Sequence, residues 1–241
     1  MTNKIIEFVS KKIISDKNNL QVLFEDNHII IVNKRAGDIV QGDKTGDKPL
    51  SDIVKEYIKD KYNKPGNVYL GTVHRLDRPT TGLVIFAKTS KVLPRLNKLF
   101  LSKDIRKTYW AIVKNEPPKT EDTLINWLKK NPKNNKSKAY SKEVSESKKA
   151  ILHYKIIKKL DNYFLLNVNL ETGRHHQIRV QLSNIGCPIK GDLKYGFDRS
   201  NKDASISLHA RHIEFLHPVK KIPISVNAPL PNDAIWNACL I

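Results

Sequence analysis

The chain of 241 residues contains only two cysteines, Cys187 and Cys239, and neither belongs to a cluster with the spacing of a zinc site. Two isolated cysteines indicate a reducing compartment, so we expect a cytoplasmic protein without disulfides. The N-terminal stretch MTNKIIEFVSKKII is too short and too charged for a secretory signal or a membrane span. We therefore expect neither a membrane partner nor a bound metal.

Acidic residues are also scarce, because 24 Asp and Glu stand against 43 Lys and Arg, giving a formal net charge of +19 at pH 7. Such an excess favours a polyanionic partner, most simply a nucleic acid. An anionic membrane surface would compete, but the sequence lacks a basic amphipathic helix with a large aromatic face. A hydrophobic content of 39% in a chain of this length is enough for a core without disulfides or metal.

Hydrophobic patterns predict short strands interspersed with helices. Residues 1–20 form an N-terminal extension of weak helical character, and residues 21–241 form one domain. Apolar residues at helical spacing predict a helix over 50–58 and another from Ser90 to Phe100. The strands that we expect cover residues 22–24, 29–32, 68–70, 83–87, 105–114, 150–157 and 163–170.

The segment after residue 120 is harder to interpret. Residues 121–129 predict a short helix. Residues 130–149 are poor in apolar residues and rich in Lys, Asn and Ser, which predicts a mobile basic loop. Its lysines either form a solvated surface or make transient contacts with RNA phosphates.

The most informative stretch is GTVHRLDRPTTGLVIFAKT over residues 71–89. Two apolar strands flank a polar turn in which Asp77 lies between Arg75 and Arg78, and Pro79 and Gly82 interrupt the backbone pattern. A loop held by two buried strands is a usual place to hold a reactive group rigidly. In the alternative interpretation, Asp77 only caps a helix or pairs with a neighbouring arginine.

Five motifs support the first interpretation, because they follow the order of one family. HRLD followed by T-T-G-L and A-K resembles the aspartate signature of the RluA-type pseudouridine synthases. The other four are N-K-R-A-G over 33–37, with Arg35 in place of the usual proline, K-x-Y-x-A over 107–111, E-T-G-R-H-H-Q-I-R-V over 171–180, and G-D-x-x-Y-G over 191–196 with the closing strand L-H-A…F-x-H-P over 208–218. The resemblance covers about residues 22 to 231, and we expect no S4-type RNA-binding module before it.

The resemblance implies a single α+β domain, with a mixed, largely antiparallel sheet, flanking helices and a central cleft. It implies a cofactor-free, metal-free enzyme that isomerises specific uridines in ribosomal RNA of the large subunit or in tRNA, and we expect a monomer. Asp77 would be the nucleophile, Tyr109 the ring on which the base stacks, and Arg179 the cation that pairs with Asp77. The side chains expected to bind RNA are His74, Arg75, Arg78, Thr81, Arg174, His176 and Gln177.

Some alternatives stay open at this point. Arg179 could instead form a structural ion pair with Glu171 or Asp192, and Thr172 is a candidate cap for the helix that contains Arg179. Whether Asp77 attacks C1′ of the ribose or removes the C2′ proton is undecided. The same fold could serve a non-catalytic RNA-binding or ribosome-assembly factor.

A metal-dependent phosphoesterase is a third possibility. His209, His212 and Glu214 could contribute to a metal site. However, residues 209–212 read as a strand, in which positions i and i+3 point to opposite faces.

Overall fold

The strands join one mixed sheet in the computed structural model, which describes residues 14–43 and 45–240. Residues 1–13 of the expected N-terminal extension lie outside the described part. Among the described residues the sheet has 11 strands. Their bounds are β1 Val22–Glu25, β2 Ile29–Lys34, β3 Gly71–Thr72, β4 Thr81–Ala87, β5 Arg106–Val113, β6 Glu121–Asn131, β7 Lys136–Tyr140, β8 Lys148–Lys159, β9 Phe164–Leu170, β10 Leu208–Leu216 and β11 Pro223–Asn227.

The strand order is β1-β2-β4-β10-β5-β9-β8-β6-β7, with β3 beside β4 and β11 beside β10. Only β4 and β10 run parallel among the described pairs, and they meet at Thr81–His209 and Gly82–Ala210. The remaining pairs are antiparallel. The expected α+β class with a largely antiparallel sheet is therefore confirmed.

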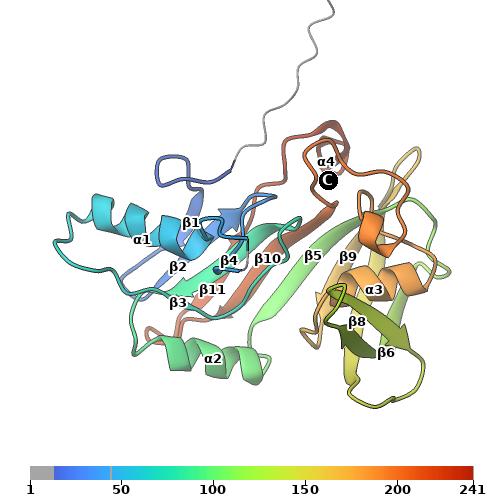
Figure 1. Cartoon of the computed structure of the whole chain (residues 1–241), viewed down its shortest axis with the longest axis horizontal. Coiled ribbons are helices and arrows are strands. Elements are labelled where there is room, and N and C mark those ends of the chain that lie inside the picture. Colours follow the sequence, from blue (N-terminus) through green and yellow to red (C-terminus); the bar gives the residue numbers. More distant parts are fainter. Residues whose placement is uncertain (1–13, 44, 241) are drawn as a thin grey trace, which may run out of the picture.

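The helices divide the molecule into two halves along this sheet (Figure 1). α1 (Leu50–Lys61) and α2 (Leu93–Leu101) accompany β2 and β4, whereas α3 (Gln177–Asn184) packs on β6 and β7. A short 3-10 helix, η1 (Leu193–Tyr195), follows α3, and α4 (Ala234–Asn237) closes the described chain. The continuous apolar runs of β2 and β4 are explained by their position, because every residue of both strands is buried.

The helix predicted over 121–129 was wrong, because β6 runs through these residues. The loop predicted over 130–149 was wrong where β7 forms an antiparallel hairpin with β6, whereas residues 141–147 lie outside the strands. Leu124 and Leu128, four residues apart, fit a helix, but they also fit the period of two in a strand, and both are buried on β6. In β7 the residues turned inward are small: Ser137 is 3% exposed, and Ala139 packs against the cluster that contains Leu128. Because these inward side chains are small, the alternation of apolar and polar residues that is typical of a strand is absent from the sequence of β7.

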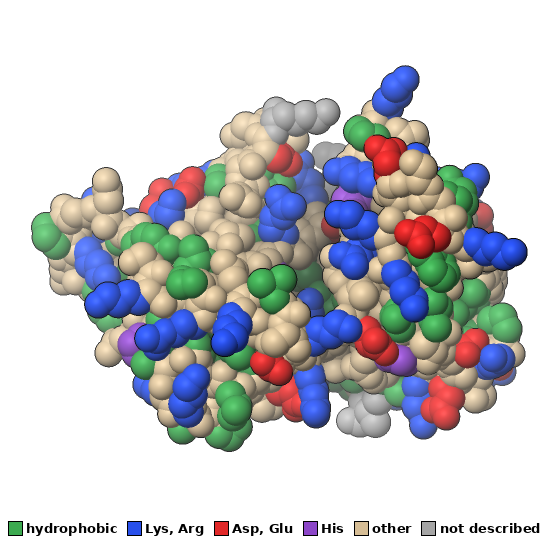
Figure 2. Space-filling view, turned by 90° about the horizontal axis from the view of Figure 1, so that it is seen from below, with side chains coloured by type: hydrophobic (Ala, Val, Ile, Leu, Met, Phe, Trp, Pro, Cys, Tyr) green, Lys and Arg blue, Asp and Glu red, His purple; other side chains and the backbone are tan. Residues whose placement is uncertain are grey.

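Seen from below, the surface is hollowed between the two halves, and Lys and Arg side chains line both rims (Figure 2). This is the expected central cleft, and its charge suits a polyanion. No helix in residues 14–43 and 45–240 is long and apolar enough to cross a membrane.

Candidate active site

The turn that carries Asp77 is fixed through its backbone carbonyl groups. The Thr80 N–H donates to Asp77 O at 3.0 Å, closing the turn, and the Gly37 N–H donates to Arg78 O at 2.9 Å. The Ile206 N–H donates to Pro79 O at 3.1 Å. Because segments from both ends of the chain satisfy its carbonyls, the turn is held rigidly.

Lys34 supports the same turn from within the fold. Its side chain is 1% exposed, and its Nζ donates to Arg78 O at 3.0 Å and to Thr80 O at 2.7 Å. A buried ammonium is costly unless its protons are hydrogen-bonded, and these carbonyls satisfy that need. Sequence reasoning quoted Lys34 only as part of the N-K-R-A-G motif and missed this function.

Gly82 lets β4 approach β10 directly after the turn. Its φ of +110° lies in the region that favours glycine, and an added Cβ would lie 2.3 Å from Ala210 O. The close pairing of β4 and β10 therefore requires glycine, and that pairing sets the position of Asp77 five residues earlier.

Arg179 on α3 joins two carboxylates. Its Nη1 donates to Asp77 Oδ2 at 2.9 Å, while its Nε and Nη2 donate to Asp192 at 2.7 and 2.9 Å. Asp192 is 1% exposed, whereas the side chain of Asp77 is 31% exposed. The bidentate pair with the buried carboxylate orients the guanidinium, which leaves one nitrogen for Asp77. Arg179 thus binds Asp77 and Asp192 at the same time, although the sequence left these two ion pairs as alternatives.

The charge state of Asp77 follows from these contacts. Burial alone would raise the pKa of Asp77, but the neighbouring His176 ring and the Arg179 guanidinium outweigh it, so the pKa lies below its usual value. Burial would lower the pKa of Arg179, but Asp192 and Asp77 raise it. At neutral pH the pair is a carboxylate and a guanidinium, which suits a nucleophile or base and not a general acid.

His176 lies near the same carboxylate oxygen. Its Nε2 is 3.6 Å from Asp77 Oδ2, and its Nδ1 is 2.9 Å from the hydroxyl of Tyr195. Burial lowers the pKa of His176 to about 3, so the ring is neutral at pH 7. His176 has φ +54° and directly precedes α3. The expected cap, Thr172, does not cap this helix, since its hydroxyl donates to Gln177 Oε1 at 2.8 Å.

Tyr109 is on β5 and is 7% exposed. Burial, and then the negative charge of Asp77, raise the pKa of its hydroxyl, which places the two groups in one electrostatic neighbourhood. Sequence reasoning joined Asp77, Tyr109 and Arg179 from three distant motifs. The structure brings all three together, although their roles in a reaction stay predictions.

Of the side chains expected to bind RNA, four are engaged inside the protein: His176, described above, and three others. His74 Nε2 accepts from the Ile85 N–H at 3.0 Å, and burial lowers its pKa to about 3. The Thr81 hydroxyl is 2.8 Å from His209 Nδ1, and Gln177 accepts from the Arg174 N–H at 3.0 Å. These contacts hold the turn and the start of α3, so an RNA contact by these three residues stays a prediction that would compete with them.

The arginines are placed differently. Arg75 and Arg174 are exposed, and Arg174 Nε donates to Lys149 O at 3.0 Å. Arg78 forms an ion pair with Asp47. Within the described residues, neither Arg75 nor Arg78 forms an ion pair with Asp77, so the guanidinium beside the acid comes from α3 and not from its sequence neighbours.

The histidines considered as metal ligands point to different partners. His209 is fully buried against Thr81, and His212 Nε2 is 2.9 Å from the hydroxyl of Ser225. Among the described residues no group of three His, Cys, Asp or Glu side chains is arranged to hold a metal ion. The histidines of β10 therefore give no support to a metal-dependent phosphoesterase.

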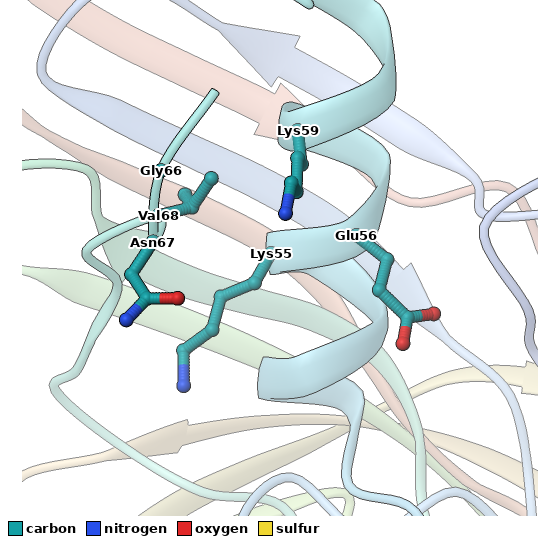
Figure 3. Close-up of a pocket in the computed structure, with 6 residues that line it drawn as sticks. All are labelled: Lys55, Glu56, Lys59, Gly66, Asn67 and Val68. Atoms are coloured by element: carbon teal, nitrogen blue, oxygen red, sulfur yellow. The ribbon is translucent and has the colours of Figure 1, made fainter. Parts of the chain in front are cut away.

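A separate depression of about 330 Å³ lies between α1 and the segment before β3. None of the side chains expected from sequence lines it, and its lysines and Glu56 are ordinary surface groups, so it is not the reaction site. The residues that line it are Lys55, Glu56, Lys59, Gly66, Asn67 and Val68 (Figure 3).

Comparison with known proteins identifies the family. The sequence family described as RNA pseudouridylate synthase matches residues 28–184. The chain is similar to "Ribosomal large subunit pseudouridine synthase D" of Zymomonas mobilis, with 33% identity over 224 residues, 89% of this chain and 70% of the relative. It is also similar to "Ribosomal large subunit pseudouridine synthase C" of Buchnera aphidicola, with 36% identity over 220 residues, 88% of this chain and 67% of the relative.

The fold is also similar to that of a solved structure with a related name. The structure resembles human "RNA Pseudouridylate Synthase Domain Containing 4", with a TM-score of 0.73 and 22% identity over 88% of this chain and 89% of that one. With a family match that spans more than half of the chain and includes the Asp77 turn, the chain belongs to the RNA pseudouridylate synthase family and is an RNA pseudouridine synthase.

Proposed function

We propose that this enzyme isomerises uridine in ribosomal RNA of the large subunit, with Asp77 as the group that reacts at the ribose. The observation that carries the proposal is the contact of a partly exposed Asp77 with Arg179, which is itself fixed by a buried carboxylate. The choice of RNA is supported by the names of the Zymomonas mobilis and Buchnera aphidicola relatives. Transfer RNA is the alternative substrate.

The chemistry required is a rearrangement without net change in composition. The N1–C1′ bond breaks, the uracil rotates, and a C5–C1′ bond forms while the C5 proton is released and N1 gains one. Asp77 would act as an ionised carboxylate, either by attack on C1′ or by removal of the C2′ proton. Its lowered pKa keeps it ionised at neutral pH.

The target base must leave its stack, which costs a few kcal/mol. Tyr109 would offer its ring to the extruded base, and the exposed Arg75 would occupy the space that the base vacates. Arg174, three residues before α3, would bind a phosphate near the cleft. The basic rims seen in Figure 2 would supply most of the affinity, without sequence preference.

The proposal includes three further points. The enzyme would work in the cytoplasm, in keeping with its two free, buried cysteines. It would act as a monomer and without a metal. Light scattering of the free protein, and activity in the presence of a chelator, would test the last two.

The test of Asp77 is release of tritium from RNA that contains C5-tritiated uridine. We expect Asp77→Asn to abolish release, a loss of at least about 10⁴-fold, while RNA affinity changes little. Asp122→Asn, which neutralises a similarly part-exposed aspartate paired with Lys119, is the matched control and should behave like the wild type. Tritium release that survives in Asp77→Asn would remove Asp77 from the mechanism.

The RNA is identified separately. Pseudouridines would be mapped in large-subunit ribosomal RNA and in tRNA from cells with and without the gene. We expect the missing modification in the ribosomal RNA; a missing modification confined to tRNA would show that the substrate assignment is wrong while leaving the role of Asp77 intact.

A further inference from the structure

The hydrogen bonds around Tyr195 determine which nitrogen of His176 carries the proton. The Ser137 N–H can only donate, and it donates to the Tyr195 hydroxyl oxygen at 2.8 Å. Within residues 14–43 and 45–240, the other hydrogen-bond partner of that oxygen is His176 Nδ1 at 2.9 Å. The phenol proton is therefore donated to Nδ1, and the neutral ring carries its own proton on Nε2.

The electrostatics of the site favour the same tautomer. His176 Nε2 faces Asp77 Oδ2 at 3.6 Å. An N–H dipole in that position attracts the carboxylate, whereas a nitrogen lone pair would repel it. The tautomer set by Tyr195 thus turns an N–H, and not a lone pair, toward Asp77.

The ring of His175 stacks on that of His176 at a centroid distance of 3.8 Å, and its hydrogen bonds favour the opposite tautomer. The Ser137 hydroxyl donates to the backbone oxygen of His175 at 2.9 Å, which uses its single proton. His175 Nδ1, 2.8 Å from the same hydroxyl oxygen, must then be the donor. Ser137 therefore sets opposite tautomers in two stacked rings.

We propose that Ser137, Tyr195 and His176 form a positioning relay that presents His176 Nε2–H to Oδ2 of Asp77. Together with Arg179 Nη1, which donates to the same Oδ2, the relay leaves Oδ1 as the oxygen that reacts with the ribose. Within the described residues, Oδ1 has no hydrogen-bond donor. The proposal rests on the proposed function of Asp77 and adds the atom and the residues that orient it.

The relay is not a proton-transfer chain, and it does not titrate near neutral pH. The groups that face His176 are Asp77, Arg179, His175, Lys194 and Tyr195. Ser137 and Tyr195 come from β7 and η1. The relay thus connects the basic β6–β7 hairpin to the acid of the active site.

The first test reads the tautomers directly in the free protein. Long-range ¹H–¹⁵N NMR distinguishes protonated from unprotonated ring nitrogens, and His176→Asn assigns the signals, since asparagine tolerates the positive φ at this position. We expect Nε2–H for His176 and Nδ1–H for His175. An Nδ1–H tautomer for His176 would overturn the relay, whatever the outcome for Asp77→Asn.

The second test removes one hydroxyl. Tyr195→Phe keeps the ring that lies 5.2 Å from the Arg179 guanidinium carbon, but it removes both the donor to His176 and the acceptor of the Ser137 N–H. We expect kcat for tritium release to fall on the order of tenfold with RNA affinity unchanged within about twofold, and the His176 signals to show both tautomers. Tyr154→Phe, which removes the hydroxyl of another buried tyrosine bonded to Lys119 O, is the control and should retain the wild-type kcat.

The outcomes separate the two proposals. A Tyr195→Phe variant with unchanged kcat, or one that loses RNA affinity instead of kcat, would contradict the relay. If Asp77→Asn retains activity while the tautomers are as expected, the proposed role of Asp77 fails and the hydrogen-bond chain is structural.

Discussion

The turn around Asp77 and the β6–β7 hairpin both contribute to one site, but they are held in different ways. The turn is fixed through its backbone carbonyls, which accept from Lys34, Gly37 and Ile206. The hairpin is held by the pairing of β6 with β8 and by the inward face of β7, where the Ser137 N–H donates to the Tyr195 hydroxyl and Ala139 packs near Val180 of α3. The reactive Asp77 is on the turn, whose backbone is fixed by several partners. Of the residues that orient it, Arg179 and His176 belong to α3 and its start, and Ser137 belongs to β7 of the hairpin.

This difference explains why changes in the turn should be more severe than changes in the hairpin. A backbone held by several buried hydrogen bonds has no alternative arrangement of similar energy. The edge strand β7 pairs with β6 and packs near α3 through a few side chains, so it can separate locally while the sheet persists. The three predictions below test that contrast.

The largest effect is expected where the turn enters β4. An alanine at position 82 would place Cβ 2.3 Å from Ala210 O at a φ of +110°, so β4 and β10 could not stay paired. We expect Gly82→Ala to lower the free energy of unfolding by about 3 kcal/mol or more, measured by urea denaturation.

Gly186→Ala is the matched control for that substitution. Gly186 also has a positive φ, +78°, but an added Cβ would have no atom within 4 Å. Only the backbone strain remains, which costs about 1–2 kcal/mol. Equal losses in the two variants would show that the close approach to β10 does not hold the turn.

A smaller effect is expected at the contact between α3 and the turn. Burial raises the pKa of Asp77, and the His176 ring and the Arg179 guanidinium hold it below its usual value. Arg179→Gln removes one of these two groups, so the pKa of Asp77 should rise. We expect kcat/KM at neutral pH to fall on the order of 10²-fold. We also expect the acid limb of its pH profile to move to higher pH.

The ionised Asp77 should also stabilise the folded protein in a pH-dependent way. Because the folded pKa of Asp77 is depressed, its contribution is present above the unfolded pKa and is lost as pH falls through the folded value. Arg179→Lys keeps a positive charge and should return the acid limb toward that of the wild type. Arg106→Gln, an exposed arginine paired with Glu214, is the control. An acid limb that stays in place in Arg179→Gln would exclude the guanidinium as the cause of the low pKa.

The turn was the part of the site that sequence could identify. Asp77, Tyr109 and Arg179 belong to motifs with a specific order and spacing, and the structure places them together. The strands β2 and β4 were equally visible, because strands buried on both faces read as continuous apolar runs.

The supporting residues could not be found in the same way. Ser137 lies in a stretch of Lys, Asn and Ser whose composition resembles a disordered loop, and its contribution comes from a backbone N–H that any residue other than proline could supply. The contact of Asp192 with Arg179 was one of two alternatives, since spacing in sequence does not show which carboxylate packs beneath the guanidinium. Such positioning depends on tertiary contacts more than on residue type.

The smallest effect is expected at the docked face of the hairpin. Ala139 packs against the cluster that includes Val180 and Tyr195, whereas the neighbouring Lys138 is exposed on the opposite face of β7. We expect Ala139→Gln to weaken this docking by roughly 1 kcal/mol through overpacking, and to lower hydrogen-exchange protection of the Ser137 amide on the order of tenfold. Lys138→Gln introduces the same side chain toward solvent and should leave that protection unchanged. If the Ser137 amide keeps full protection in both variants, pairing with β6 is enough to hold β7. If protection is lost in both variants, opening of β7 does not depend on its contact with α3.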